Sequence, residues 1–293
     1  MQHLRSLLRS RLVLAFGVLV SVLVPVVTLP RLPHVSPWPV LLGLVPWVVG
    51  KYVLCPLRWR ALTNADLKRR WHLRAYAEGE LLGLLTPGHV GADVWRVHRL
   101  TASGLPRGDA LVSVASDRLV GALGLVAFVA FAGATLPLRM ALVATGVTVL
   151  AILVALVVRR VRPDLLPRRP LPPTRRLVHA FVLSAGYQLS IAALLMGTLA
   201  ATGHDLSPLA LLGAFGASQV AGAIPGPNGA SPRDGALIAA LMALGIPFQA
   251  ALAAVAVKAA VAWVPALALG GVSLLLARRT LRDAVADPVV SCA

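Results

Sequence analysis

Residues 86–96 read TPGHVGADVWR, and residues 224–234 read IPGPNGASPRD. Each stretch interrupts a hydrophobic run with Pro-Gly, a second Gly three residues after the first, and a charged pair just beyond it. A Gly-apolar-Pro turn follows each stretch, and then a long apolar segment with one basic residue deep inside it, Arg118 in the first and Lys258 in the second. The chain therefore contains an internal repeat of about seventy residues, a symmetry that organises many membrane transporters.

The composition indicates a polytopic membrane protein. The chain is 58% hydrophobic and only 13% charged, whereas soluble domains carry about 25% charged residues. At about 20 apolar residues per spanning helix, there is room for about six to eight helical elements. The net charge of +17 comes from Arg clusters between hydrophobic runs. That is the positive-inside pattern of membrane proteins, rather than a nucleic-acid-binding surface. The two cysteines, Cys55 and Cys292, form neither a metal pattern nor a disulfide framework.

Apolar runs predict the helices, and the basic segments between them predict the topology. We expect a retained first helix rather than a cleaved signal peptide, and a second helix with Lys51 near its cytoplasmic end, where it would snorkel to the headgroups. The expected helices are residues 12–29, 38–55, 110–136, 140–158, 177–202 and 246–277. The segments 57–74, with six basic residues, and 159–176, with seven Arg, are expected in the cytoplasm. We expect residues 1–293 to form one membrane domain in the plasma membrane, with both termini cytoplasmic. The 159–176 linker is expected to separate repeat halves at about 38–136 and about 177–277.

The segments that hold the two quoted stretches are predicted to be re-entrant hairpins. Both flanks of residues 75–100 are basic, so this segment leaves and returns on one side. Its apolar arm of about ten residues is too short to cross, which favours a hairpin over a pair of spans. Of the 28 basic residues, this topology places 22 inside, two outside and four in the membrane. The second hairpin, within residues 209–245, then dips in from the opposite face. The predicted fold is all-α, with about six spans and two re-entrant hairpins in inverted repeats, broken at Pro87, Gly88 and Gly91 and at Pro225, Gly226 and Gly229.

Paired broken helices in inverted repeats are typical of secondary transporters that bind their substrate at mid-depth. Helix N-termini at Pro-Gly breaks attract anions. Arg118 and Lys258 lie about 16–18 Å into their helices, a depth at which an ionised residue is a functional candidate. We therefore expect a site for a lipid phosphate. Its binding residues would be Arg96, Arg118, Arg233 and Lys258, and the supporting carboxylates, which orient them or carry coupled protons, Asp93, Asp117 and Asp234.

The alternative is that these charges only pair with one another and lock the two halves together. Asp93 and Arg96 have the spacing of a pair on one helix face. Asp117 and Arg118 are neighbours and point apart, so each needs a partner elsewhere. Gln219 and Asn228 are candidate polar lining residues of the second hairpin.

Other chemistries find little support in the sequence. Glu78 and Glu80 could form a proton site, but the favoured interpretation is a pair of carboxylates near the Arg-rich inner surface. His89 and His98 have no third ligand nearby, so neither a metal nor another cofactor is expected. The chain contains no P-loop and no His-Glu-x-x-His. Ser231 has no later His to activate it, so we expect no enzyme.

At these residues the chain resembles the membrane domain of lysylphosphatidylglycerol synthases. That flippase-like family includes the membrane part of an archaeal dolichol-phosphate glycosyltransferase. The similar segments are residues 58–60, 76–96, 117–118, 225–234 and 265–270. Ala92 replaces a usual Gly, Ser231 to Asp234 replace a usual Gly and Glu, and Lys258 replaces a common Arg. The resemblance implies a stand-alone membrane domain, since nothing after Asp287 could form the soluble synthase domain. Aminoacyl-lipid synthesis is therefore not expected.

The resulting hypothesis is a flippase-like protein for lipid transport. It would bind an anionic lipid headgroup, of a phospholipid or a polyprenyl phosphate, and translocate it between leaflets. The alternative is a non-transporting membrane subunit that presents lipid to a separate glycosyltransferase or lipid synthase. Its docking face would be the basic segments 57–74 and 159–176, although attraction to anionic lipids explains those segments as well. An intramembrane hydrolase is disfavoured because a nucleophile–base pair is missing.

Overall fold

All regular structure in the described part of the chain is helical, which confirms the all-α prediction. A computed structural model describes residues 36–86, 89–131, 157, 160–161, 172–221 and 231–276. The elements are α3 (Pro37–Val49), the π-helical η2 (Gly50–Leu54), α4 (Cys55–Leu62), α5 (Arg69–Leu84), α6 (Val90–Ala102), α7 (Arg107–Phe131), α9 (Thr174–Ala200), α10 (Pro208–Ala221), α11 (Pro232–Ala243), α12 (Phe248–Val261), α13 (Trp263–Pro265) and the π-helical η4 (Ala266–Gly271). The expected helix at 12–29, most of that at 140–158 and most of the 159–176 linker lie outside the described residues.

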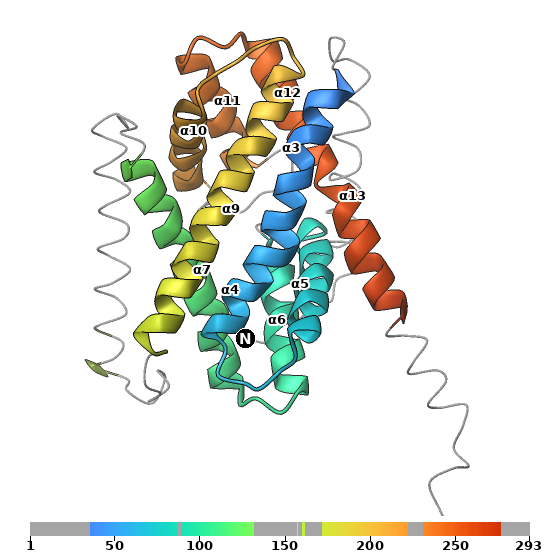
Figure 1. Ribbon diagram of the computed structural model, residues 1–293, viewed down its shortest axis with the longest axis vertical. Helices are drawn as coiled ribbons and strands as arrows, with labels where there is room; N and C mark the ends of the chain where they lie inside the picture. The colour runs from blue at the N-terminus through green and yellow to red at the C-terminus, as the bar shows by residue number, and fades with distance from the viewer. Residues whose placement is uncertain are drawn as a thin grey trace, which may run out of the picture.

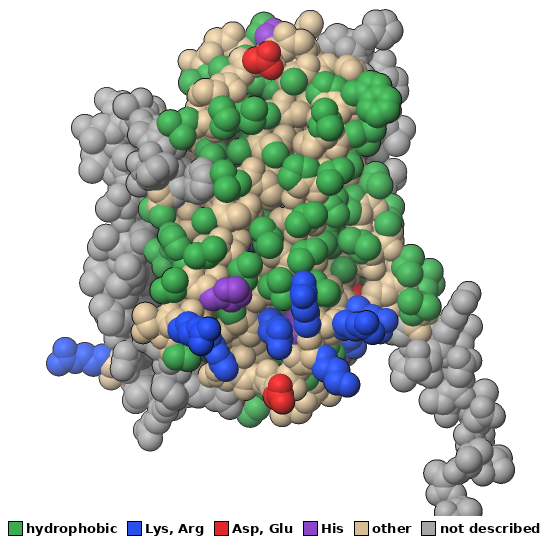
Figure 2. Space-filling model, in the orientation of Figure 1, with side chains coloured by type: hydrophobic (Ala, Val, Ile, Leu, Met, Phe, Trp, Pro, Cys, Tyr) green, Lys and Arg blue, Asp and Glu red, His purple; other side chains and the backbone are tan. Residues whose placement is uncertain are grey.

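Four stretches of the described chain are long and apolar enough to cross a membrane: Pro37–Leu62, Arg107–Ala127, Thr174–Ala200 and Phe248–Leu276. The first joins α3, η2 and α4, and the last joins α12, α13 and η4. Figure 1 shows α3 and α4 running alongside α9 through the length of the molecule. On the face drawn in Figure 2 the middle is apolar and the Lys and Arg side chains gather near one end. This is the surface of a membrane protein.

The contact between α3 and α9 depends on two glycines. A Cβ atom on Gly197 would lie 2.3 Å from the backbone oxygen of Pro39, and one on Gly43 would lie 2.5 Å from that of Ala193. Real Cβ atoms do not approach backbone oxygens so closely. Small residues at such crossings let two helices pack backbone to backbone, which is a main source of stability in membranes.

The two helix pairs that hold the repeated stretches lie toward opposite ends of the long helices. α5 packs against α6 near one end, and α10 packs against α11 near the other (Figure 1). The opening stretch interrupts helical structure, since α5 ends at Leu84 and α6 begins at Val90. The predicted break at Gly91 is wrong, because Gly91 is the second residue of α6. The first arm is longer than predicted, because α5 begins at Arg69 and includes polar turns that hydropathy assigned to a loop. Six spans and re-entrant insertion from opposite faces remain predictions.

Each helix pair ends in the same glycine turn. Gly104 has a φ of 94° and Gly245 a φ of 89°, the left-handed region that favours glycine. The next residue closes the turn in both cases: the N–H of Leu105 donates to Leu100 and the N–H of Ile246 to Leu241, each at 3.1 Å. This is a common way to end a helix. The order of helix pair, glycine turn and long helix therefore occurs twice.

The α3–α9 contact predicts that Gly197→Ala destabilises the protein. The added methyl group must push the two helices apart, at a cost of about 1–3 kcal/mol. Thermal unfolding of the detergent-purified protein should show a lower Tm. Gly108→Ala is the control, since a Cβ atom there meets nothing within 4 Å. An unchanged Tm for Gly197→Ala would contradict the close packing.

Candidate functional site

A cavity of about 340 Å³ lies where the two helix pairs meet the long helices. Its lining divides into two chemical kinds. The charged side chains are Lys51, Arg58, Glu80, Arg118, Arg233 and Lys258, and the apolar ones include Leu125, Ile191, Leu194, Leu195 and Phe215. Gln219 also lines the cavity, as the sequence predicted for this residue. The space is therefore amphipathic, with polar groups placed in a mainly apolar wall as in many ligand sites.

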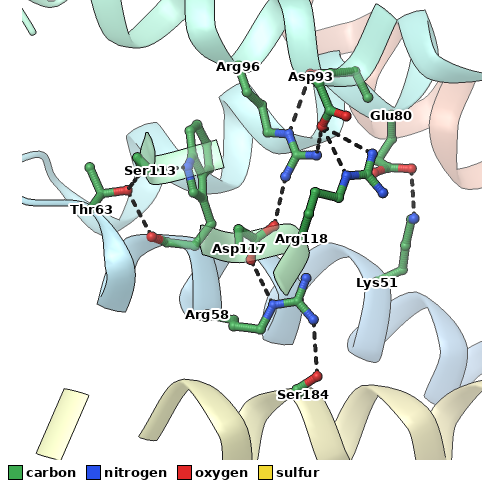
Figure 3. A network of polar contacts seen from close by, with 12 residues as sticks. Lys51, Arg58, Thr63, Glu80, Asp93, Arg96, Ser113, Asp117, Arg118 and Ser184 are labelled. Atoms are coloured by element: carbon green, nitrogen blue, oxygen red, sulfur yellow. Dashed lines mark hydrogen bonds and ion pairs between the residues drawn. The ribbon is translucent and has the colours of Figure 1, made fainter. Parts of the chain in front are cut away.

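Asp117 on α7 lies at the centre of a buried network beside the cavity (Figure 3). The Nε of Arg58 on α4 donates to its Oδ1 at 2.7 Å, and the Nη1 of Arg96 on α6 donates to its Oδ2 at 2.9 Å. Arg58 also donates to the hydroxyl of Ser184 on α9 at 3.3 Å. This confirms that Asp117 finds its partners away from the neighbouring Arg118. One carboxylate thus joins three helices through two charge-assisted hydrogen-bond pairs.

Asp93 on α6 links Arg96 to Arg118, which lines the cavity (Figure 3). Its Oδ1 accepts from the Nη2 of Arg96 at 2.5 Å, the i, i+3 pair that the sequence predicted. The same oxygen accepts from the Nε of Arg118 at 3.1 Å. The Arg118 side chain is 49% exposed, against 2% for Arg96. Arg118 is therefore the guanidinium of this network with room for a ligand, while Arg96 is fully occupied by protein.

The second repeat contributes a smaller cluster built on Asp234 of α11. Its Oδ1 accepts from the Nζ of Lys258 on α12 at 3.1 Å. Its Oδ2 accepts from the backbone N–H of Ser231 at 3.2 Å, while the N–H of Asp234 donates to the Ser231 hydroxyl, also at 3.2 Å. This capping box satisfies donors at the start of α11.

The starts of α6 and α11 are therefore less open to an anion than expected. At α6 the backbone N–H of Gly91 donates to the hydroxyl of Thr86 at 2.8 Å. A Cβ atom on Gly91 would lie 2.5 Å from the oxygen of Leu82, so this glycine allows close approach of the two arms. Side-chain oxygens of the protein occupy donors at both helix starts. The attraction for an anion comes chiefly from the basic side chains instead.

The cavity carries more positive than negative charge. Arg233 lines it and makes no hydrogen bond or ion pair with another residue of the described chain. In and around the cavity the described residues supply six basic side chains and four carboxylates. These are Lys51, Arg58, Arg96, Arg118, Arg233 and Lys258, and Glu80, Asp93, Asp117 and Asp234. An anion with one or two charges, such as a phosphate, would balance this excess.

The structure brings together three of the four residues assigned to phosphate binding. Arg118, Arg233 and Lys258 line the cavity. Arg96 lies behind them, 4.9 Å above the ring of Tyr76, and its position suits the holding of Asp93 and Asp117. The predicted breaks at Pro87, Gly88, Pro225, Gly226 and Gly229 lie outside the described residues.

Sequence reasoning missed Lys51 and Arg58 and misplaced Glu80. Lys51 does not lie near a helix end, because α4 continues the helix to Leu62; its Nζ lies 2.9 Å from Glu80. Arg58, counted as a cytoplasmic loop residue, is only 5% exposed. Glu80 faces the cavity rather than the inner surface. The Arg-Trp pattern at 58–59 was the available signal for Arg58. The local sequence gives no sign that the helix continues past Pro56, because proline is disfavoured in a helix interior and is tolerated mainly in the first turn.

The family model described as "Lysylphosphatidylglycerol synthase TM region" matches residues 10–270. The chain belongs to this family. No curated protein and no solved structure matches it. The resemblance found in the sequence is thereby confirmed. Together with four membrane-length apolar helices, it identifies a membrane protein associated with lipid handling. The family describes a membrane region rather than the synthase domain.

Asp117→Asn is expected to be strongly destabilising. It removes the counter-ion of buried Arg58 and one of the two counter-ions of buried Arg96, which costs about 3–5 kcal/mol. The Tm of the purified variant should fall sharply. Asp93→Asn is the matched control and should lower the Tm less, because the Asp93 side chain is 35% exposed and water can solvate its partners. Equal Tm values for the two variants would contradict the central role of Asp117.

Proposed function

We propose that the cavity binds the phosphate of an anionic lipid and that the protein moves this lipid between the leaflets of the plasma membrane. The observation that carries the proposal is the excess of basic over acidic side chains in a cavity whose other walls are apolar. Burying cations without counter-ions is costly in a membrane protein. A ligand that brings the missing negative charge removes that cost.

The depth of the basic residues supports a site inside the membrane. Lys51 lies near the middle of the span Pro37–Leu62, and Arg118 near the middle of Arg107–Ala127. Lys258 lies 10 residues into Phe248–Leu276, which is about 15 Å at 1.5 Å per residue. A phosphate bound among these side chains would have left both headgroup layers. A lipid headgroup at that depth is the intermediate that translocation requires.

The division of the lining supports an amphiphilic ligand. The guanidinium groups of Arg118 and Arg233 can each offer paired N–H donors to phosphate oxygens. The apolar wall, which includes Leu125 on α7 and Phe215 on α10, can meet the acyl or prenyl chain. A free inorganic anion has no apolar part that could pack against that wall. A phospholipid or a polyprenyl phosphate would use both parts of the cavity.

The repeated architecture supports movement between leaflets. Each repeat supplies a helix pair, and the two pairs lie toward opposite ends of the long helices (Figure 1). In transporters built from inverted repeats, rocking of one repeat against the other opens a central site to alternate sides. We infer that both pairs are re-entrant and that the end rich in Arg and Lys is cytoplasmic, as the positive-inside rule indicates.

Removal of a basic cavity residue should slow lipid movement. In proteoliposomes with fluorescent phosphatidylglycerol, the wild-type protein should make inner-leaflet headgroups accessible to an added quencher. Arg118→Ala and Lys258→Ala should each slow this by about 10- to 100-fold, since a hydrogen bond to a charged group contributes about 1.5–3 kcal/mol. Arg107→Ala is the control, an exposed Arg at the start of the same α7. Equal rates for all four proteins would reject the site.

A second candidate function is docking of a partner enzyme. A groove of about 550 Å³ lies between the end of α4, residues 63–67 and the start of α9. Its charged lining includes Arg60 and Asp66 from segment 57–74 and Arg176 from segment 159–176, the two segments predicted to form a docking face. His179 of α9 also lines the groove. The partner would be a membrane-associated glycosyltransferase or lipid synthase that receives lipid from this protein. This groove is separate from the cavity.

The docking function has its own test. A glycosyltransferase or lipid synthase that co-purifies with the wild-type protein should be lost from the double variant Arg60→Gln, Arg176→Gln. The Arg118→Ala variant should retain it, because Arg118 does not line the groove. Retention of the enzyme by the double variant would reject docking at this groove.

A further inference from the structure

The ion pair between Lys51 and Glu80 stands apart from the other charges of the cavity. Lys51 lies in the π-helical turn η2, a local widening that is frequent at functional sites. Its Nζ lies 2.9 Å from the Oε2 of Glu80 on α5 and 5.8 Å above the ring of Tyr187 on α9. A Cβ atom on the neighbouring Gly50 would lie 1.9 Å from the hydroxyl of Ser190, so η2 is held tightly against α9. The position of Lys51 is therefore well defined.

Glu80 is held more weakly than the other three carboxylates of the site. Asp117 accepts from two Arg side chains, and so does Asp93. Asp234 accepts from Lys258 and from the capping box of α11. Within the described chain Glu80 has a single ion-pair partner, Lys51. Breaking that one pair would release Glu80 and leave the ion pairs of Asp93, Asp117 and Asp234 intact.

Glu80 is also the carboxylate that a ligand would meet. Of the four carboxylates, it alone is among the described residues that line the cavity. Asp93, Asp117 and Asp234 lie behind the basic residues they hold. A phosphate that approaches Lys51 therefore comes close to Glu80. Two anions at short range in a site of low dielectric repel strongly, and one of them then gains a proton.

Proton uptake resolves this conflict with no change in covalent structure of the lipid. One proton from water binds a carboxylate oxygen of Glu80 and gives the neutral acid. Lys51 remains an ammonium group and transfers its ion pair from Glu80 to the phosphate. The neutral acid can then donate a hydrogen bond to a phosphate oxygen. One proton enters the cavity with each headgroup, and no bond in the lipid forms or breaks.

We propose that Glu80 is an exchangeable counter-ion: it neutralises Lys51 in the empty cavity and binds a proton when the lipid phosphate takes its place. This proton site depends on the phosphate site proposed above. It would link lipid movement to the proton gradient, because release of the headgroup returns the proton.

Other groups around Glu80 must be separated from it in the test. The charged and titratable side chains that line the cavity around it are Lys51 and Tyr52 from η2, Arg58 from α4, Tyr76 from α5, His89 at the start of α6, Arg118 from α7, Tyr187 from α9, Arg233 from α11 and Lys258 from α12. Arg96 of α6 lies behind them, and η4, which packs on α5, carries no charged residue. Among these residue types histidine has the unperturbed pKa closest to neutral, although burial lowers the pKa of His89 to about 4. It therefore supplies the matched control.

Calorimetry measures the proton directly. Short-chain phosphatidylglycerol, a phosphodiester that does not titrate near neutral pH, is bound to the detergent-purified protein at pH 7. Two buffers with different ionisation enthalpies report the number of protons taken up per lipid. We expect about one for the wild type and for His89→Gln, and about zero for Glu80→Gln with affinity retained, because binding is linked to a single titrating group. Uptake that persists in Glu80→Gln would overturn the proposal.

Two further variants keep the outcomes distinct. The double variant Lys51→Met, Glu80→Gln leaves no unpaired charge behind, so it tests the same loss of uptake where Glu80→Gln alone fails to fold. Uptake by the double variant would overturn the proton site. Arg118→Ala tests the phosphate site itself: it should bind lipid at least 10-fold more weakly, as expected for a lost charge-assisted contact. Unchanged binding by Arg118→Ala would reject the phosphate site, whereas weakened binding with no proton uptake by the wild type would reject only the role of Glu80.

Discussion

The ion pairs of Asp117 hold together the part of the molecule on which the candidate site depends. This buried carboxylate binds Arg58 and Arg96 and so ties α4 and α6 to α7. Its neighbour Arg118 points away from it and toward the cavity, where it pairs with Asp93. Two adjacent residues on one helix therefore have different roles. One fixes the scaffold, and the other presents a positive charge to the interior.

The cavity has a surplus of positive charge because only one of the four carboxylates lines it. In an apolar medium each buried cation needs a partner. Asp93, Asp117 and Asp234 satisfy theirs from behind the cavity wall, and Glu80 satisfies Lys51 from within it. The second repeat has a smaller set of ion pairs. It contains the pair of Asp234 and Lys258, whereas the first repeat joins five charged residues: Arg58, Asp93, Arg96, Asp117 and Arg118. The unbalanced charges and the apolar wall together describe a receptor for the headgroup and chain of an anionic lipid.

The sequence predicted the fold class and the main charges but not how the charges pair. Hydropathy and spacing predict the membrane character, the interruption between α5 and α6, the Asp93–Arg96 pair and the mid-helix position of Arg118. The positions of Arg58 and Lys51 were not predicted, because the hydropathy pattern predicts a helix that ends before Arg58, whereas the helix continues to Leu62. The pairing of Glu80 with Lys51 depends on the contact between α5 and η2. Such contacts between distant segments leave no local pattern in one sequence.

The account is tested most directly by a cryo-EM map of the protein in nanodiscs that contain phosphatidylglycerol. It predicts headgroup density inside the cavity, within hydrogen-bonding distance of Arg118 and Lys258 and next to Glu80, with an acyl chain along the apolar wall. An empty cavity under saturating lipid, with headgroups only at the two membrane surfaces, would contradict it.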